Sequence, residues 1–253
     1  DPPLDEVKNR SFEFGARGTN DGLDLFGIDH VISWNATAFA GRNFNDIIFI
    51  GGNKVGTGYF RNVGNTQRMG TELALNGKLG DKWTWYGNYS YVRASFETHQ
   101  LIASAGHGSN TGVCNGPEEY GGGGDAAATA DQEACETKES YQIQVGPGDA
   151  IPGLSPHIGR MGIGYTPIDD LNLFVDAEYN SRQFYRGDED NNDGQKVPGY
   201  FLLNASAEYS VPASNASAAG FSTSIFIEGR NLLDTNFETG GILAENEVDG
   251  TGG

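Results

Sequence analysis

The chain has 253 residues, of which 37% are hydrophobic and 20% charged, and its 34 acidic and 16 basic residues give a net charge of −18. Binding to nucleic acid is excluded, because phosphate recognition needs a basic face. A transmembrane helix is excluded because no run of about 18 apolar residues exists. A membrane β-barrel stays open, since its strands alternate apolar with polar side chains.

Eight segments along the chain alternate apolar and polar residues with a period of two, which predicts extended strands with two different environments. Each is near the roughly 9–11 residues that a membrane strand needs. In chain order, these segments are centred on residues 12–17, 32–38, 72–78, 83–91, 160–165, 171–180, 201–211 and 221–230.

The segment 171–180 shows the pattern most clearly. Its apolar face carries Leu171, Leu173, Val175, Ala177 and Tyr179. Its other face carries Asn172, Phe174, Asp176, Glu178 and Asn180. These segments predict an all-β fold of about eight strands, and their alternation is typical of an antiparallel up-and-down transmembrane β-barrel.

The predicted connections alternate between short and long, as they do in outer-membrane barrels. Short ones are expected at residues 19–29, 80–82, 167–170 and 212–220, and long ones at 99–156, 187–199 and from 234 onward, with 51–56 as a modest exception. The three long connections hold 17 acidic residues and only Lys138 and Lys196 as bases, so they carry −15 of the net charge. Acidic residues are therefore expected on one side of the barrel.

Several stretches, in this order, resemble the C-terminal barrel of TonB-dependent outer-membrane receptors. They are SFEFGAR (11–17), WNATAF (34–39), YFRNVGN (59–65) leading into GTEL (70–73), YGNYSYV (86–92), PGDAIPGLSPH (147–157), QFYRGD (183–188), VPGY (197–200) and GRNLLD (229–234). The resemblance covers nearly the whole chain. It identifies the architecture better than it identifies the cargo.

The resemblance implies that residues 1–253 are the C-terminal part of a barrel of roughly 22 strands with a plugged lumen. Residues 99–156 are then a long extracellular loop insertion. The plug domain, the periplasmic TonB-contacting box and the final strand with its terminal aromatic residue have no counterpart in the sequence, so a fragment of a larger receptor is expected. The implied location is the outer membrane of a Gram-negative cell.

Little in the sequence favours catalysis or metal binding. None of His30, His99, His107 and His157 falls in a metal-binding spacing, and no nucleophile elbow or phosphate loop occurs. Residues 188–194 look like a calcium loop, but the glycine falls one position late and Gly199 stands where a ligating glutamate is needed. We therefore expect no catalytic residue, no metal and no cofactor.

Cys114 and Cys135 lie 20 residues apart in the long acidic connection. The outer membrane is assembled from an oxidising compartment, so a disulfide between them is expected. Closing a loop of this size contributes roughly 3 kcal/mol by the chain-entropy estimate.

Cargo contacts are expected on the inner wall near the extracellular mouth, where cations and aromatic rings suit an anionic, partly aromatic molecule such as an iron–siderophore complex. The candidates, each at the upper end of a predicted strand or beside it, are Arg42, Phe60, Arg61, Arg93, Arg182, Phe184, Tyr185, Arg186 and Arg230. A structural role competes with this one, because lumen arginines commonly pair with wall acids such as Glu178 or Glu228.

The function implied by the resemblance is TonB-energised uptake of a scarce nutrient. Its partners are outer-membrane lipid, the inner-membrane TonB complex acting through the plug, and a small-molecule cargo (siderophore, cobalamin or glycan). Two alternatives stay open. One is a complete eight-stranded barrel that acts as a structural protein or adhesin. The other is a soluble glycan-binding β-sandwich, which needs Trp34, Trp83 and Trp85 in its core.

Overall fold

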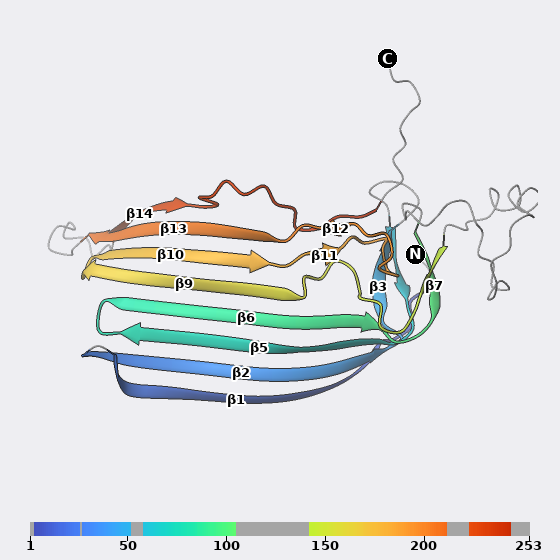
Figure 1. The fold of residues 1–253 in the computed structure, drawn as a ribbon, viewed down its shortest axis with the longest axis horizontal. Coiled ribbons are helices and arrows are strands. Elements are labelled where there is room, and N and C mark those ends of the chain that lie inside the picture. Colours follow the sequence, from blue (N-terminus) through green and yellow to red (C-terminus); the bar gives the residue numbers. More distant parts are fainter. Residues whose placement is uncertain (1–2, 26, 52–57, 105–141, 212–222, 244–253) are drawn as a thin grey trace, which may run out of the picture.

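The computed structural model describes residues 3–25, 27–51, 58–104, 142–211 and 223–243. Its main element is one antiparallel sheet of eight strands in the order β1-β2-β5-β6-β9-β10-β13-β14 (Figure 1). The strands are β1 (Lys8–Leu25), β2 (Ile28–Phe44), β5 (Thr66–Leu79), β6 (Trp83–Phe96), β9 (His157–Ile168), β10 (Leu171–Asn180), β13 (Tyr200–Val211) and β14 (Thr223–Gly229). All eight predicted strands are confirmed.

Three short hairpins lie at one end of this sheet. They are β3 (Ile47–Gly51) with β4 (Gly58–Asn62), β7 (Gln100–Ala103) with β8 (Gln142–Val145), and β11 (Gln183–Phe184) with β12 (Lys196–Val197). Each interrupts the connection between two strands of the main sheet (Figure 1). We call this the loop end and the opposite one the turn end.

The predicted alternation of connections is confirmed, with two corrections. The first turn is much shorter than residues 19–29, because β1 continues to Leu25 through a register shift between Asn20 and Leu23, and β2 begins at Ile28. The connection between β2 and β5 is longer than residues 51–56, because it contains the whole β3–β4 hairpin. Both errors come from segments whose glycine and asparagine content is typical of turns.

One face of the sheet, which we call the apolar face, carries no Asp, Glu, Lys or Arg between the turn end and the level of Tyr91. Directly paired residues of an antiparallel sheet lie on the same face, so the register defines this set. A row across five strands shows it: Ala36, Leu73, Tyr89, Gly159 and Tyr179. Large side chains on this face are exposed, with Phe12 at 72% and Ile227 at 72%.

Two aromatic belts border the apolar face. Trp83, Tyr165 and Tyr209 lie near the turn end, and Tyr91, His157 and Phe201 lie eight residues away on the same three strands. Eight residues span about 27 Å along a strand and about 20 Å along the membrane normal at a tilt of about 40°. This is close to the apolar band of about 25 Å, flanked by aromatic girdles, that a membrane barrel presents to lipid.

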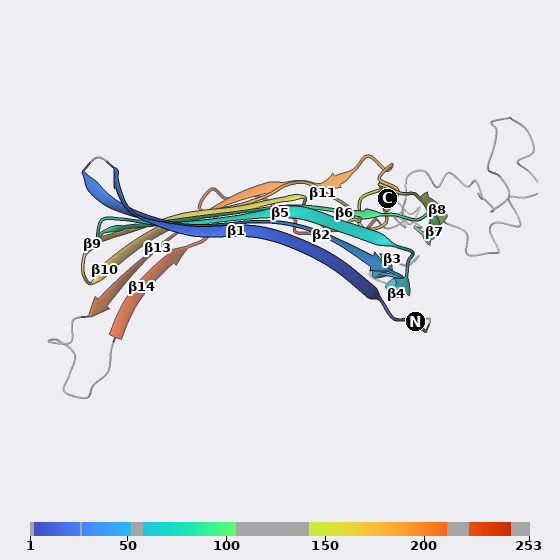
Figure 2. The same cartoon turned by 90° about the horizontal axis from the view of Figure 1, so that it is seen from below.

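The hydrophobic core of the described residues lies at the loop end and not under the sheet. It joins the small hairpins to the last residues of β6, and its members are Ile50, Val63, Ala94, Phe96, Ile102, Ile143, Val145 and Ile151. Seen from the side, the main sheet is a single curved layer (Figure 2).

This architecture contradicts both alternative folds. In the described residues β1 and β14 are edge strands that do not pair with each other, so the eight strands do not close into a small barrel. A sandwich needs a second large sheet over buried tryptophans, but Trp34 and Trp83 are each 39% exposed on the single layer. The described residues also include no helix with the length and apolar character needed to span a membrane.

Candidate functional site

The face opposite the apolar one, here called the polar face, holds every charged side chain of the main strands between the turn end and the level of Tyr91. These residues are Arg17, Asp24, Asp29, Glu72, Lys78, Arg160, Asp176, Glu178, Glu208 and Glu228, with Glu13 and Arg68 further toward the loop end and Asp21 in the irregular stretch of β1 between Asn20 and Leu23. A sheet with all its charge on one face separates a wet environment from an apolar one.

Ion pairs and hydrogen bonds link the middle strands across the polar face. Arg160 on β9 lies 3.2 Å from Glu178 on β10, and the Asn180 amide donates to the same carboxylate at 2.8 Å. The Asn204 amide on β13 donates to Asp176 at 2.9 Å. The contacts of Arg160 with Glu178 and of Asn204 with Asp176 join side chains in cross-strand register, so they stabilise the wall, and Asn180 supports Glu178 from the same strand.

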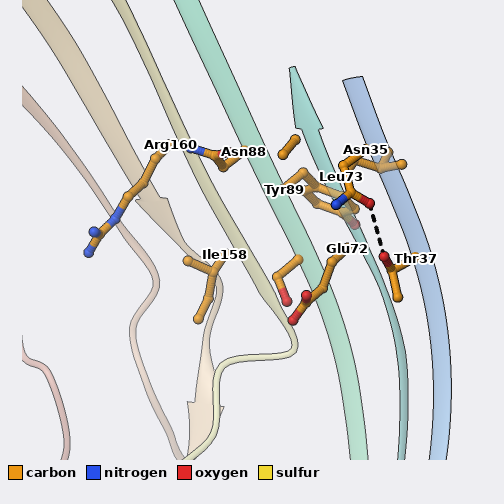
Figure 3. Close-up of a pocket in the computed structure, with 10 residues that line it drawn as sticks. Asn35, Thr37, Glu72, Leu73, Asn88, Tyr89, Ile158 and Arg160 are labelled. Carbon is orange, nitrogen blue, oxygen red and sulfur yellow. Dashed lines mark hydrogen bonds between the residues drawn. The ribbon is translucent and has the colours of Figure 1, made fainter. Parts of the chain in front are cut away.

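A hollow of about 230 Å³ lies beside this network, between β2, β5, β6 and β9. Figure 3 shows Glu72 and Thr37 on neighbouring strands, with Arg160 and Asn88 at the opposite side of the hollow. Thr37 donates to the Asn35 side-chain oxygen at 3.0 Å (Figure 3). This hollow combines a carboxylate, amides and a guanidinium group, which suits a polar, hydrogen-bonding surface. Its charged groups are of both signs, so it is neither an acidic nor a basic pocket.

A second hollow, of about 480 Å³, opens on the apolar face around Gly87. Apolar side chains line it almost throughout, including Met161, Ile163 and Leu203. It lies between the two aromatic belts, on the face opposite the charged residues.

At the loop end, an aromatic and cationic cluster connects two hairpins. Phe49 and Phe60 are opposite each other on β3 and β4, and their rings meet edge to face at 5.5 Å. The Arg186 guanidinium lies over the Phe49 ring at 5.6 Å. Nearby, the Tyr185 hydroxyl donates to Glu238 at 3.3 Å. We call these five residues the mouth cluster.

The surroundings of Tyr185 disfavour loss of its phenolic proton. Burial, followed by the charge and hydrogen bond of Glu238, raises the pKa of Tyr185 above its usual value of 10.0. The chain segment behind it is fixed by two backbone hydrogen bonds, from Arg186 to Gly241 at 3.1 Å and from Leu243 to Arg186 at 2.7 Å.

The sequence candidates do not form one site. Phe60, Tyr185 and Arg186 come together in the mouth cluster, and Arg61 follows Phe60 on β4. Phe184 lies under the Lys196 ammonium group at 3.8 Å, and Arg182 is an exposed residue between β10 and β11.

Three of the arginine candidates are placed elsewhere. The expected inward position of Arg42 and Arg93 is wrong: Arg42 pairs with Gln67 and Arg93 with Met69, in register with the apolar face. Arg230 forms a two-point ion pair with Glu228, at 2.8 and 3.2 Å, which confirms the expectation that wall acids pair with arginine.

A loop-to-loop clasp, which the sequence did not predict, holds the acidic segment 188–194. Asn191, at φ 61°, accepts from the Ala150 amide at 2.6 Å and donates to its carbonyl at 3.0 Å. Asn tolerates this left-handed conformation better than most residues. Among the residues described, no group of three or more His, Cys, Asp or Glu is arranged to hold a metal ion. Cys114 and Cys135 lie outside the described residues.

A second network fixes the loop end of β2 to β5. The buried Asp46 carboxylate accepts from the Thr66 hydroxyl at 2.5 Å and from the Arg68 guanidinium at 2.9 Å. Burial raises the pKa of Asp46, but the hydrogen bond from Thr66 and the charge of Arg68 outweigh it and bring the value below 3.8. Asp46 is therefore ionised at neutral pH and holds β2 against β5.

The sequence reasoning missed Phe49 and Glu238 in the mouth cluster and Asn191 in the clasp. Phe49 stands in the apolar run IIFIG (47–51), and the stretch YFRN follows at 59–62. These two strand-like segments, so close in the sequence, were a usable signal for a hairpin. Glu238 and Asn191 act across long sequence separations, and no local pattern reveals such contacts.

Comparison with known proteins gives a family and two distant folds. A family model described as "TonB dependent receptor-like, beta-barrel" matches residues 1–232. The closed form of the ferric-catecholate import receptor Fiu from E. coli K12 shares 13% identity at a TM-score of 0.44, over 84% of this chain and 24% of that one. The copper transporter OprC shares 13% identity at a TM-score of 0.45, over 90% of this chain and 32% of that one. The chain thus spans about a quarter to a third of these proteins. Among curated proteins, none matches it.

Proposed function

Because the chain belongs to the TonB-dependent receptor β-barrel family, whose members are transporters and not enzymes, we propose that it forms part of the wall of a receptor that imports a scarce nutrient across the outer membrane. One observation carries this proposal: between the turn end and the level of Tyr91, the charged side chains that the strand register assigns to a face all lie on one face, and a charge-free band between two aromatic belts lies on the other. That arrangement fits a wall between lipid and a watery lumen.

The open edges of the sheet support a place within a larger barrel. β1 and β14 each have one side without a strand partner among the described residues. Unpaired backbone groups cannot remain in hydrocarbon, so further strands must complete the pairing there. We propose that the chain supplies the C-terminal part of the barrel, that the loop end is extracellular and that residues 99–156 form an extracellular loop.

For the cargo, we propose an iron–siderophore complex, with cobalamin and glycans as the competing classes. The mouth cluster supports this choice, since it offers the Arg186 cation and the Phe60 ring, which is 50% exposed. An anionic, partly aromatic ligand matches these groups. Energy for release would come from the inner-membrane TonB complex acting on the plug.

Uptake by cells tests the transport proposal. A strain that lacks the full-length gene should lose uptake of one ferric siderophore, regain it from a plasmid copy, and lose it again when tonB is deleted. Unchanged uptake of every siderophore, cobalamin and glycan offered would refute the proposal. Loss confined to cobalamin or a glycan would keep the transporter and correct the cargo.

A pair of arginine variants tests the mouth cluster. Arg186→Gln removes the cation over Phe49, and Arg182→Gln removes an exposed cation that has no aromatic partner among the described residues. A cation–π contact between Arg186 and an aromatic ring of the cargo would contribute about 0.5–2 kcal/mol, so the first variant should weaken cargo binding from about twofold to about 30-fold. Equal affinity of both variants, measured by calorimetry on the full-length receptor, would remove the mouth cluster from the cargo site.

A further inference from the structure

Three arginines lie together on the apolar side of the sheet, at its border with the loop end. Arg10 on β1 and Arg42 on β2 are direct cross-strand partners. Arg93 on β6 lies in the adjacent row, where Phe12, Ala40 and Met69 continue the same face. All three are exposed. We call them the border arginines.

Their arrangement is costly without an anion. Like charges directly opposite each other in an antiparallel pair destabilise a sheet, yet the guanidinium groups of Arg10 and Arg42 share the Phe44 ring, at 5.4 and 5.2 Å from its centroid. Glu97 neutralises only Arg42, at 2.5 Å. Within the described part of the chain, neither Arg10 nor Arg93 has an ion-pair partner.

The border arginines are confined to one part of the border. On β9, β10 and β13 the last outward positions before the loop end are His157, Tyr179 and Phe201, which lie level with Tyr91 or Tyr89, and none of them is an arginine or a lysine. The concentration is unexpected in a chain of net charge −18. Generic anchoring at a membrane interface would distribute cations around the border, whereas a cluster on β1, β2 and β6 indicates a localised anion.

We infer that the border arginines bind the phosphate groups of a phosphorylated lipid headgroup in the outer leaflet. The inference rests on the proposed membrane placement, in which this face meets lipid and the border meets headgroups. Guanidinium groups bind phosphate oxygens through paired, charge-assisted hydrogen bonds. The stacked Phe44 ring and the ion pair with Glu97 hold Arg42 in place. Imported cargo does not reach these side chains, because they point away from the lumen.

Binding of a diphosphorylated glycolipid (lipid A) to the full-length receptor in detergent tests the inference. The variant Arg10→Gln/Arg93→Gln changes two exposed residues and leaves the Arg42–Glu97 pair intact. The control Arg17→Gln removes a cation from the polar face of β1. At roughly 1 kcal/mol for each cation near a lipid surface, the double variant should bind about 30-fold more weakly, and the control should bind as the wild type does.

Three outcomes would overturn the inference: equal binding by the double variant, an equal loss in Arg17→Gln, or equal binding of the glycolipid after enzymatic removal of its phosphates. Inorganic phosphate should compete only weakly, because it lacks the acyl chains that place the headgroup at the border. Strong competition would assign the arginines to a soluble anion instead. Siderophore uptake by the same cells separates this test from the transport proposal, since normal uptake without glycolipid binding rejects only the lipid site.

Discussion

An arginine substituted for Val175 tests whether the apolar face meets hydrocarbon. Val175 lies in the middle of β10, four residues from Leu171 and four from Tyr179. Four residues span about 13 Å along a strand, or about 10 Å along the membrane normal at a tilt of about 40°. The introduced charge would therefore lie near the centre of the apolar band.

A charge on the lipid face at that depth costs about 2–4 kcal/mol. The folding equilibrium of Val175→Arg should therefore fall by about 30-fold to 700-fold. The matched control is Ser206→Arg on the neighbouring strand β13, where Ser206 pairs with Phe174 and Glu228 on the polar face. A new cation beside Glu228 in a wet lumen should change stability by less than about 1 kcal/mol.

Reversible urea unfolding of the full-length receptor in lipid vesicles, followed by tryptophan fluorescence, measures both variants. The reasoning fails if Val175→Arg is as stable as the wild type, or if Ser206→Arg loses as much stability as Val175→Arg does. A loss restricted to Val175→Arg supports a lipid-facing surface.

Three other changes test separate parts of the structure. Asp46→Asn should cost about 1–3 kcal/mol, because Thr66 and Arg68 lose a charged acceptor. The pKa of Asp46 is lowered in the folded state. The stability that Asp46 contributes is therefore present above pH 3.8 and is lost as the pH falls through the lower folded-state pKa. The urea midpoint of the variant should depend less on pH between about pH 2 and 5 than that of the wild type. Asn191→Ala should speed hydrogen exchange at the Ala150 amide, whereas Asn192→Ala, which leaves the two hydrogen bonds to Ala150 in place, should not; equal protection in both would reject the clasp. Residues 1–253 expressed alone should aggregate in water, because the sheet has two open edges and an exposed apolar face; a monodisperse monomer in gel filtration without detergent would count against the membrane assignment.

The main strands could be predicted because a period of two is a local signal. β10 was predicted at its observed bounds, since Leu171–Asn180 alternates throughout and ends at turns on both sides. β1 is longer than its predicted core because its second half carries glycine, asparagine and aspartate, which are typical of turns. Neighbouring β2 pairs with it along this length and overrides the local preference.

The small hairpins could not be predicted by the same reasoning. β7 and β8 are four residues each and are separated by 38 residues of sequence. They are held by burial of Ile102 and Ile143 in the loop-end core. Such packing depends on distant contacts and leaves no periodic signal in so short a segment.

The placement of Arg42 and Arg93 could have been predicted. Ala36 and Ala38 are three and two steps of two from Arg42, and Tyr89 and Tyr91 precede Arg93 with the same parity. Counting by two along these strands places both arginines with the apolar side chains. The error came from treating strand ends as mouth residues before assigning them to a face.

Accessibility along β10 tests the central claim most directly. Single cysteines at positions 172–177 of the full-length receptor, made in a background without Cys114 and Cys135, can be spin-labelled in lipid vesicles. Oxygen, which concentrates in hydrocarbon, should relax the labels at 173, 175 and 177, and a water-soluble nickel complex should relax those at 172, 174 and 176. Labels that show no alternation, or that prefer the nickel complex at 173, 175 and 177, would contradict a wall between lipid and lumen.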